Sequence, residues 1–198
     1  ANDTRMRLKT DRYVAFAETV IDGVTLRADY AQKNRNYDAV SVLYGARTPM
    51  LFDTQSNYLG VSARKTFQLG LAESSFLLGL EANDWDQSRI YPTQPNWGTV
   101  LLDSRARGLY VKSDTDHKSS GIRLSLGWRE ENFKRNQLFT GTKTSLDETL
   151  HAWDLGLSKS LSTEQAIYFR HAKSYRVANL DEFTTPALDV NYNPINLV

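Results

Sequence analysis

The sequence has no cysteine, no excess of charge of one sign and no long apolar run. The absence of cysteine excludes disulfides, thiolate metal ligands and cysteine nucleophiles. The 24 Lys and Arg residues nearly balance the 23 Asp and Glu residues, so the chain lacks the field that attracts nucleic acid, and we expect no such partner. No stretch approaches the roughly 20 apolar residues of a transmembrane helix. A helical membrane protein is excluded, but a β-barrel is not, because its strands alternate apolar and polar residues.

Signatures of catalysis and metal binding are also missing. The three histidines, His117, His151 and His171, are far apart and lack the spacing of metal ligands. No phosphate-binding glycine loop and no Gly-x-Ser-x-Gly motif occurs. Glu130 and Glu131 are adjacent, so in a strand they point to opposite faces and do not share a substrate. We therefore expect no enzyme, no metal site and no cofactor.

Alternation with a period of two residues recurs along the whole chain and predicts an all-β fold. Around Ile122, for example, Ile122, Leu124 and Leu126 alternate with polar positions, whereas no capped helical pattern is sustained. The pattern indicates about eight long antiparallel meander strands, forming a transmembrane barrel segment that we expect as a curved sheet or partial barrel. The predicted strands are Met6 to Val20, a second from Val24, Ser56 to Phe67, Ser75 to Ile90, Leu101 to Lys112, one around Ile122 to Arg129, one around Ala152 to Ser158, and Gln165 to Tyr175.

The links between these strands alternate in predicted length. Short links are expected at Ile21 to Gly23, Gln68 to Ser74, Asp114 to Ser119 and Leu161 to Glu164, and long links at Asp38 to Gln55, Gln87 to Val100 and Lys134 to Asp147. Short links then share one rim of the sheet and long links the other. This asymmetry is typical of outer-membrane barrels, which have short periplasmic turns and longer extracellular loops.

A soluble antiparallel sandwich also alternates apolar and polar residues and stays open as an alternative. Strands of about 10 to 15 residues favour the membrane barrel, because about 9 to 11 are needed to cross a bilayer. We expect the polar face to line a watery lumen and to hold four glycines, Gly60, Gly79, Gly127 and Gly156. The inward polar residues would be Arg27, Arg64, Glu81, Asn83, Arg123 and Arg129. An interfacial aromatic girdle would contain Tyr30, Tyr58, Trp128 and Trp153.

The last 32 residues carry three motifs in series: the pair Tyr175-Arg176, the run Asn179-Leu180-Asp181-Glu182, and Asn193-Pro194 followed by Leu197. This stretch resembles the corresponding region of TonB-dependent outer-membrane receptors, except that Ala178 replaces the usual Pro. The resemblance implies that residues 1–198 are part of a single receptor barrel domain, in a barrel of about 22 strands that is filled by a plug domain. Neither the plug nor the segment that contacts TonB is identified in this chain.

The resemblance further implies a location in the bacterial outer membrane, contact with its lipid, and coupling to TonB through the plug. The function it implies is ligand-gated uptake of a metal chelate such as a ferric siderophore or cobalamin. Candidate ligand-binding residues, in the long loops or the lumen, are Arg89, Tyr91, Trp97, Arg135, Tyr175 and Arg176. The alternatives are a passive porin-like barrel and, less favoured, a soluble β-sheet binding module.

Overall fold

The computed structural model describes residues 5–43, 46–92, 99–139, 141–175, 187–188 and 194–195. Side chains are described for all of these except 41–43, 46–47, 139, 142, 187–188 and 194–195. Within these ranges no helix is long and apolar enough to cross a membrane. The described chain is built from β-strands joined by turns.

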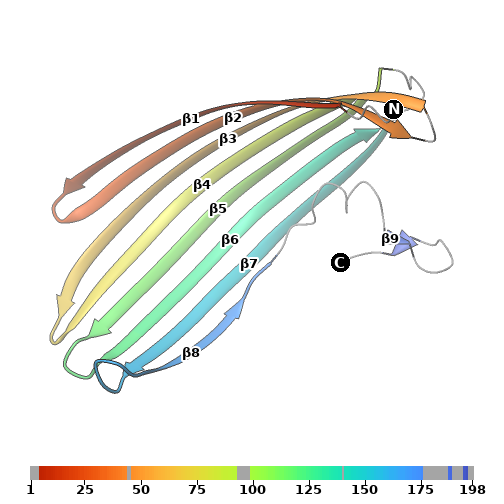
Figure 1. Ribbon diagram of the computed structural model, residues 1–198. Helices are drawn as coiled ribbons and strands as arrows, with labels where there is room; N and C mark the ends of the chain where they lie inside the picture. The colour runs from red at the N-terminus through yellow and green to blue at the C-terminus, as the bar shows by residue number, and fades with distance from the viewer. Residues whose placement is uncertain are drawn as a thin grey trace.

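Eight strands form one antiparallel sheet in which each strand pairs with its neighbours in sequence (Figure 1). They are β1 Arg5–Ile21, β2 Val24–Leu43, β3 Ala46–Leu69, β4 Ala72–Ile90, β5 Thr99–His117, β6 Ile122–Phe139, β7 Thr142–Ser160 and β8 Ala166–Lys173. A separate two-stranded pair joins β9 Ala187–Leu188 to β10 Pro194–Ile195. The predicted all-β meander of eight strands in an open sheet is thus confirmed.

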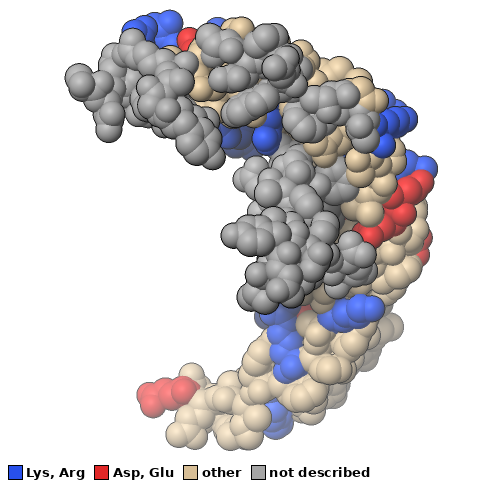
Figure 2. All heavy atoms as spheres, turned by 90° about the vertical axis from the view of Figure 1, so that its right-hand side faces the viewer, with Lys and Arg blue, Asp and Glu red and all other residues tan. Residues whose placement is uncertain are grey.

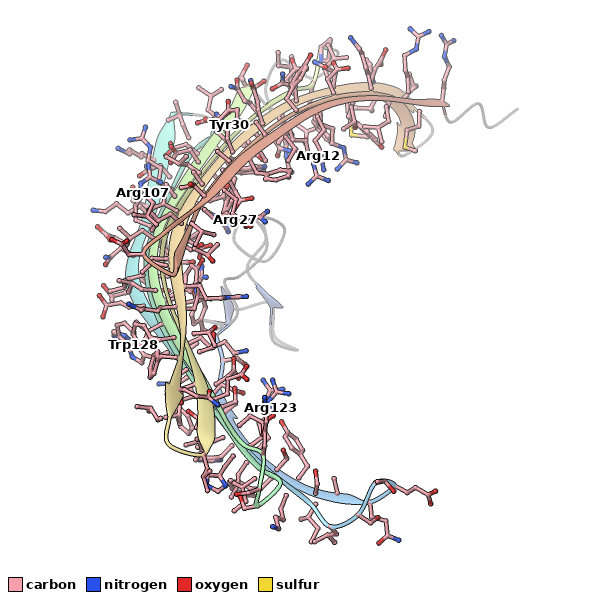
Figure 3. The ribbon with its side chains drawn as sticks, turned by 90° about the vertical axis from the view of Figure 1, so that its left-hand side faces the viewer. Arg12, Arg27, Tyr30, Arg107, Arg123 and Trp128 are labelled. Atoms are coloured by element: carbon pink, nitrogen blue, oxygen red, sulfur yellow. The ribbon has the colours of Figure 1, made fainter. Side chains whose placement is uncertain are left out.

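The sheet bends into a trough with a concave and a convex face (Figures 1 and 3). Its profile is a crescent that is open on one side (Figure 2). Arg27 and Arg123 lie on the concave face, whereas Tyr30 and Trp128 lie on the convex face (Figure 3). Side chains alternate along a strand, and directly paired residues share a face. The register therefore assigns each remaining strand residue to the concave or the convex face. The predicted separation of apolar and polar faces is confirmed.

An apolar belt crosses the convex face. On β6, for instance, its residues are Ile122, Leu124 and Leu126, and the belt ends at Trp128, which pairs with Trp153 of β7. The belt consists of Leu26, Ala28, Leu59, Val61, Phe76, Leu78, Leu80, Leu109, Val111, Ile122, Leu124, Leu126, Leu155, Leu157, Ile167 and Phe169. Most of its large side chains are exposed. Such a continuous exposed apolar surface is costly in water and is the surface that a membrane barrel presents to lipid.

Strands β1 to β7 are 17 to 24 residues long, longer than the predicted strands and than the about 9 to 11 residues that cross a bilayer. Two of the predicted long links are therefore wrong. Apart from residues 44–45, the segment Asp38 to Gln55 belongs to β2 and β3, and apart from 140–141, Lys134 to Asp147 belongs to β6 and β7. Cross-strand pairing holds the first of these segments to its neighbour: the Asn36 amide of β2 donates to the Asp53 carboxylate of β3 at 2.6 Å. In the second of these segments, a polar composition was mistaken for a loop.

The third predicted long link, Gln87 to Val100, is shorter than expected, because β4 continues to Ile90 and β5 begins at Thr99. The two rims nevertheless exist. The turn rim holds links 22–23, 70–71, 118–121 and 161–165, and the opposite hairpin rim holds 44–45, 91–98 and 140–141. At the first turn Asp22 has φ 50° and Gly23 φ 72°, the pair of positive angles that an Asp-Gly hairpin turn requires. The turn predicted from these two residues is confirmed.

Candidate functional site

Five side chains from three neighbouring strands and the link after β4 meet on the concave face near the hairpin rim: those of Tyr37, Phe52, Gln87, Arg89 and Tyr91. Tyr37 of β2 stacks on Phe52 of β3, with ring centroids 5.3 Å apart and planes 9° from parallel. Tyr91 packs edge-on against Phe52 at 6.3 Å. The Arg89 guanidinium of β4 lies 5.2 Å from the Phe52 ring centroid, and its Nε donates to Gln87 at 2.7 Å. We call these five residues the rim cluster. It combines flat rings with a held positive charge, a pairing that suits anionic and aromatic ligands.

The register explains why the rim cluster forms. Tyr37 pairs directly with Phe52, and Phe52 pairs directly with Arg89. Directly paired residues have side chains about 5 Å apart on one face of a sheet. The three strands thereby place two aromatic rings, Tyr37 and Phe52, and one cation, Arg89, side by side.

A second group lies on the concave face of β5 and β6. The Arg135 guanidinium lies 5.0 Å from the centroid of the Phe133 ring. Both side chains are buried, as are Gln137 on the same face of β6 and Val100 and Leu102 on β5. Arg135 lies seven positions beyond the end of the apolar belt, and burial lowers its pKa. The group is a packed part of the wall.

Lower on the wall, Arg129 joins two carboxylates and two phenols into a mid-wall cluster. Its guanidinium forms ion pairs with Glu81 of β4 and Glu131 of β6, and its Nε donates to the Tyr175 hydroxyl at 2.8 Å. The Tyr58 hydroxyl donates to Glu81 at 3.5 Å. Two carboxylates on one guanidinium leave this cluster with a formal charge of −1. Such a polar group on the concave wall fits a watery interior.

Tyrosine rings fill the space that glycines leave on the same face. A Cβ on Gly79 would lie 2.2 Å from Cζ of Tyr110, and a Cβ on Gly60 would lie 2.5 Å from the Tyr58 hydroxyl. Such distances are far inside van der Waals contact, so these two positions require glycine unless the ring moves. The prediction that glycines occupy the polar face is confirmed, and at Gly60 and Gly79 the physical reason is the close approach of an aromatic ring.

The structure unites some of the predicted site residues. Arg89 and Tyr91 share the rim cluster, Arg135 lies apart on the wall, and Tyr175 reaches the mid-wall cluster. Pro194 lies in the two-stranded pair. The remaining predicted residues lie outside the described residues: Trp97, Arg176, Asn179, Leu180, Asp181, Glu182 and Asn193.

Sequence reasoning missed Phe52, because it lies in the segment Asp38 to Gln55 that was taken for a loop, and it missed Tyr37, which directly precedes that segment. The sequence signal that could have found them is that both are aromatic residues in a stretch where apolar and polar residues alternate. The assignment of Tyr58 to the interfacial girdle is wrong: Tyr58 pairs with Asn83 on the concave face, one position away from the outward Leu59. Among the described residues, no group of three or more His, Asp or Glu side chains is arranged to hold a metal ion.

A curved meander of overlong antiparallel strands, with an apolar belt outside and a polar wall inside, defines a segment of an outer-membrane β-barrel. No protein-family model matches the sequence, and no curated protein matches it. Solved structures do match, and three of them, which are of low identity to this chain, show the fold alone.

The alcaligin outer-membrane receptor FauA from Bordetella pertussis superposes with a TM-score of 0.74 at 14% identity, covering 83% of this chain and 28% of that receptor. The ferric preacinetobactin receptor BauA from Acinetobacter baumannii gives 0.70 at 11% identity, over 83% of this chain and 30% of the other. The siderophore receptor PiuA from the same organism gives 0.67 at 12%, over 84% and 32%. The chain thus spans less than a third of these receptors. The predicted resemblance to TonB-dependent receptors is confirmed at the level of the fold, and the outer-membrane location that the name of FauA gives agrees with the expected one.

Proposed function

We propose that this chain is a wall segment of an outer-membrane receptor that imports a metal chelate, a ferric siderophore in particular. The solved receptors with this fold support the proposal, because their names identify alcaligin, ferric preacinetobactin and a siderophore as ligands. Energy would come from TonB through a plug domain, as the sequence resemblance implies. Residues 1–198 would then form part of one barrel domain, with the hairpin rim outside the cell.

The single observation behind the proposal is the rim cluster on the concave wall. A ligand entering from the hairpin rim would meet the stacked rings of Tyr37 and Phe52 and the guanidinium of Arg89. Siderophores with aromatic rings and anionic oxygens match both features, since cations bind oxyanions and ring faces stack. Trp97, Arg135 and Arg176 remain candidates from the sequence for further contacts, as does Tyr175.

The mid-wall cluster has a separate proposed role in the same barrel. Its formal charge of −1 and its position below the rim suit contact with a basic surface inside the lumen, such as one on a plug. Glu131 is only 8% exposed, so its carboxylate needs a fixed cationic partner, which Arg129 supplies. The main chelate contacts are therefore assigned to the rim cluster, with Tyr175 as a further contact at this level.

The test is uptake of radiolabelled ferric siderophores by cells that depend on the protein. Phe52→Ala and Arg89→Ala should each weaken chelate binding about tenfold, the scale of losing one stacking or charge-assisted contact. Arg123→Ala is the matched control, because Arg123 is also concave but lies near the turn rim. Equal effects from all three variants would contradict the assignment of the rim cluster.

The same assay separates the alternatives. An energised receptor loses uptake when an uncoupler removes the proton gradient, whereas a passive porin conducts without it. A protein that stays soluble without detergent would instead favour a β-sheet binding module.

A further inference from the structure

Three basic side chains gather on the concave wall beside the rim cluster. Arg12 of β1 lies on the concave face (Figure 3), and its direct partner on β2 is Lys33. Arg35 lies two positions further along the same face of β2, towards the hairpin rim. All three side chains are exposed. We call Arg12, Lys33 and Arg35 the basic patch, and with one charge on each residue its formal charge is +3.

Carboxylates are absent from the surroundings of the basic patch. Consider the row of directly paired residues that begins at Arg12 and the next two concave rows towards the hairpin rim. Within the described residues these rows cross β1 to β6 without an Asp or a Glu. Asp29, four residues before Lys33, lies about 13 Å away along β2 and is held by Arg27 at 2.7 Å. Glu148 faces the same interior from β7, on the far side of the wall from β2.

The position of the lysine is unfavourable for the sheet itself. Lys33 pairs directly with Arg12 on one side and with Ser56 on the other, and Arg35 pairs with a threonine on each side. The strands on both sides of β2 therefore supply no carboxylate at these positions. Like charges directly opposite each other destabilise a sheet. Local conflicts of this kind are typical of functional sites, and an anion bound between the two cations relieves the repulsion.

The convex face at the same height carries the opposite charge. One row of direct partners runs from Asp11 through Asn34, Gln55 and Asp86 to Asp103, with three carboxylates and no cation. Both faces lie beyond the apolar belt, so contact with lipid does not require this sorting of charge. The whole chain has a net charge of only +1. Positive charge is therefore concentrated on the concave wall by position and not by composition.

The basic patch and the rim cluster face the same interior. Arg35 is two strands away from Arg89 and one row further from the rim, which corresponds to about 12 Å between their Cα atoms. Tyr37, whose ring stacks on Phe52, is two positions from Arg35 on the same face of β2. Long basic side chains from both groups can therefore contact one ligand that lies against the rings.

We propose that the basic patch binds anionic oxygens of the imported chelate, and that the chelate carries a net negative charge when it is loaded with iron. The inference rests on the proposed function, because it names the charge class of the ligand in the same lumen. Arginine and lysine bind anionic oxygens through charge-assisted hydrogen bonds. A wall of one charge sign also raises the local concentration of an anion and its association rate. Neutral and cationic chelates are then poor ligands.

The test measures chelate binding to the purified full-length protein in detergent, at low and at high ionic strength. The probes are a ferric tris-catecholate, which is an anion, and a ferric tris-hydroxamate without net charge. Lys33→Gln and Arg35→Gln each remove one charge from the basic patch. Lys9→Gln is the matched control, because Lys9 has the same charge and lies on the convex face of β1 at the same height.

Lys33→Gln and Arg35→Gln should each weaken binding of the anionic chelate about tenfold at low ionic strength. High ionic strength should reduce the difference between these variants and the unaltered protein, and Lys9→Gln should bind like the unaltered protein. Lys33→Gln should not lower the free energy of unfolding, because it removes a pair of like charges, so its weaker binding is not a folding defect.

The proposal is overturned if the neutral chelate binds as tightly as the anionic one, or if Lys9→Gln weakens binding as much as Lys33→Gln. In either case, weaker binding by Phe52→Ala would still support chelate import through the rim cluster. Cells that import no ferric chelate through the protein would instead contradict the proposed function itself.

Discussion

On one strand, a charged residue placed on the convex face and an apolar residue placed on the concave face should lower the free energy of unfolding by very different amounts. Leu124 and Arg123 are neighbours on β6 and lie on opposite faces: Leu124 pairs with Leu157 in the apolar belt, and Arg123 pairs with Ser158 on the concave wall. Leu124→Arg places a guanidinium against lipid tails. Arg123→Leu places an apolar side chain in a watery interior.

The expected magnitudes follow from the depth of each residue. Arginine on the lipid face near the bilayer midplane costs about 2 to 4 kcal/mol, falling to about 0 to 1 near the interfaces. Leu124 lies two belt positions from Trp128, the aromatic residue at the belt's edge, so the cost should be about 2 kcal/mol or more. Arg123→Leu removes a side chain with no ion pair in the described residues and should cost less than about 1 kcal/mol.

The assay is reversible unfolding of the purified protein in lipid vesicles. Unfolding is caused by a urea titration and is detected by tryptophan fluorescence. Leu155→Arg, on the facing strand, should repeat the large effect because Leu155 also lies in the belt. Equal losses for the inward and outward substitutions would refute the assignment of the two faces.

Two further predictions concern the concave wall and use the same unfolding assay. Gly79→Ala should lower the free energy of unfolding by about 1 to 3 kcal/mol, because the new methyl group would overlap the Tyr110 ring. Gly127→Ala should be nearly neutral, because its nearest neighbour would lie at an ordinary 3.6 Å; a larger loss at Gly127 would count against this packing. Arg129→Met should cost about 1 to 3 kcal/mol, a value reduced for partial exposure, by leaving the buried Glu131 uncompensated, and adding Glu131→Gln should restore part of it. A double variant less stable than Arg129→Met would contradict that cause.

The sequence pattern predicts the strands and their faces well, for a physical reason. In the belt, the side chains of Leu124 and Leu126 must meet lipid while Arg123 and Ser125 meet water, so alternation is enforced residue by residue. The Asp22-Gly23 turn is equally local, because few residues tolerate two successive positive φ angles.

Beyond the belt this constraint disappears, and prediction fails with it. Both faces of the strands meet water there, so a polar stretch such as Gln32 to Asp38 of β2 has the same composition as a loop. Its strand state depends on pairing, as between Asn36 and Asp53, which only the register shows.

The candidate site could be predicted only in part for the same reason. Arg89 and Tyr91 stood out as a cation and an aromatic near a rim. Phe52, the ring that both contact, lies on another strand, and its position opposite Arg89 is set by the pairing of β3 with β4. The contact between Arg129 and Tyr175 likewise joins residues far apart in sequence.

The central claim is that the convex face contacts lipid while the concave face contacts water. Since the chain has no cysteine, single cysteines can be placed at each position from 122 to 128, labelled with a fluorophore, and quenched from brominated lipid tails or from aqueous iodide. If the convex face contacts lipid and the concave face contacts water, brominated lipid should quench the even positions and iodide should quench the odd positions. Quenching without this alternation, or aqueous access to both faces, would contradict it.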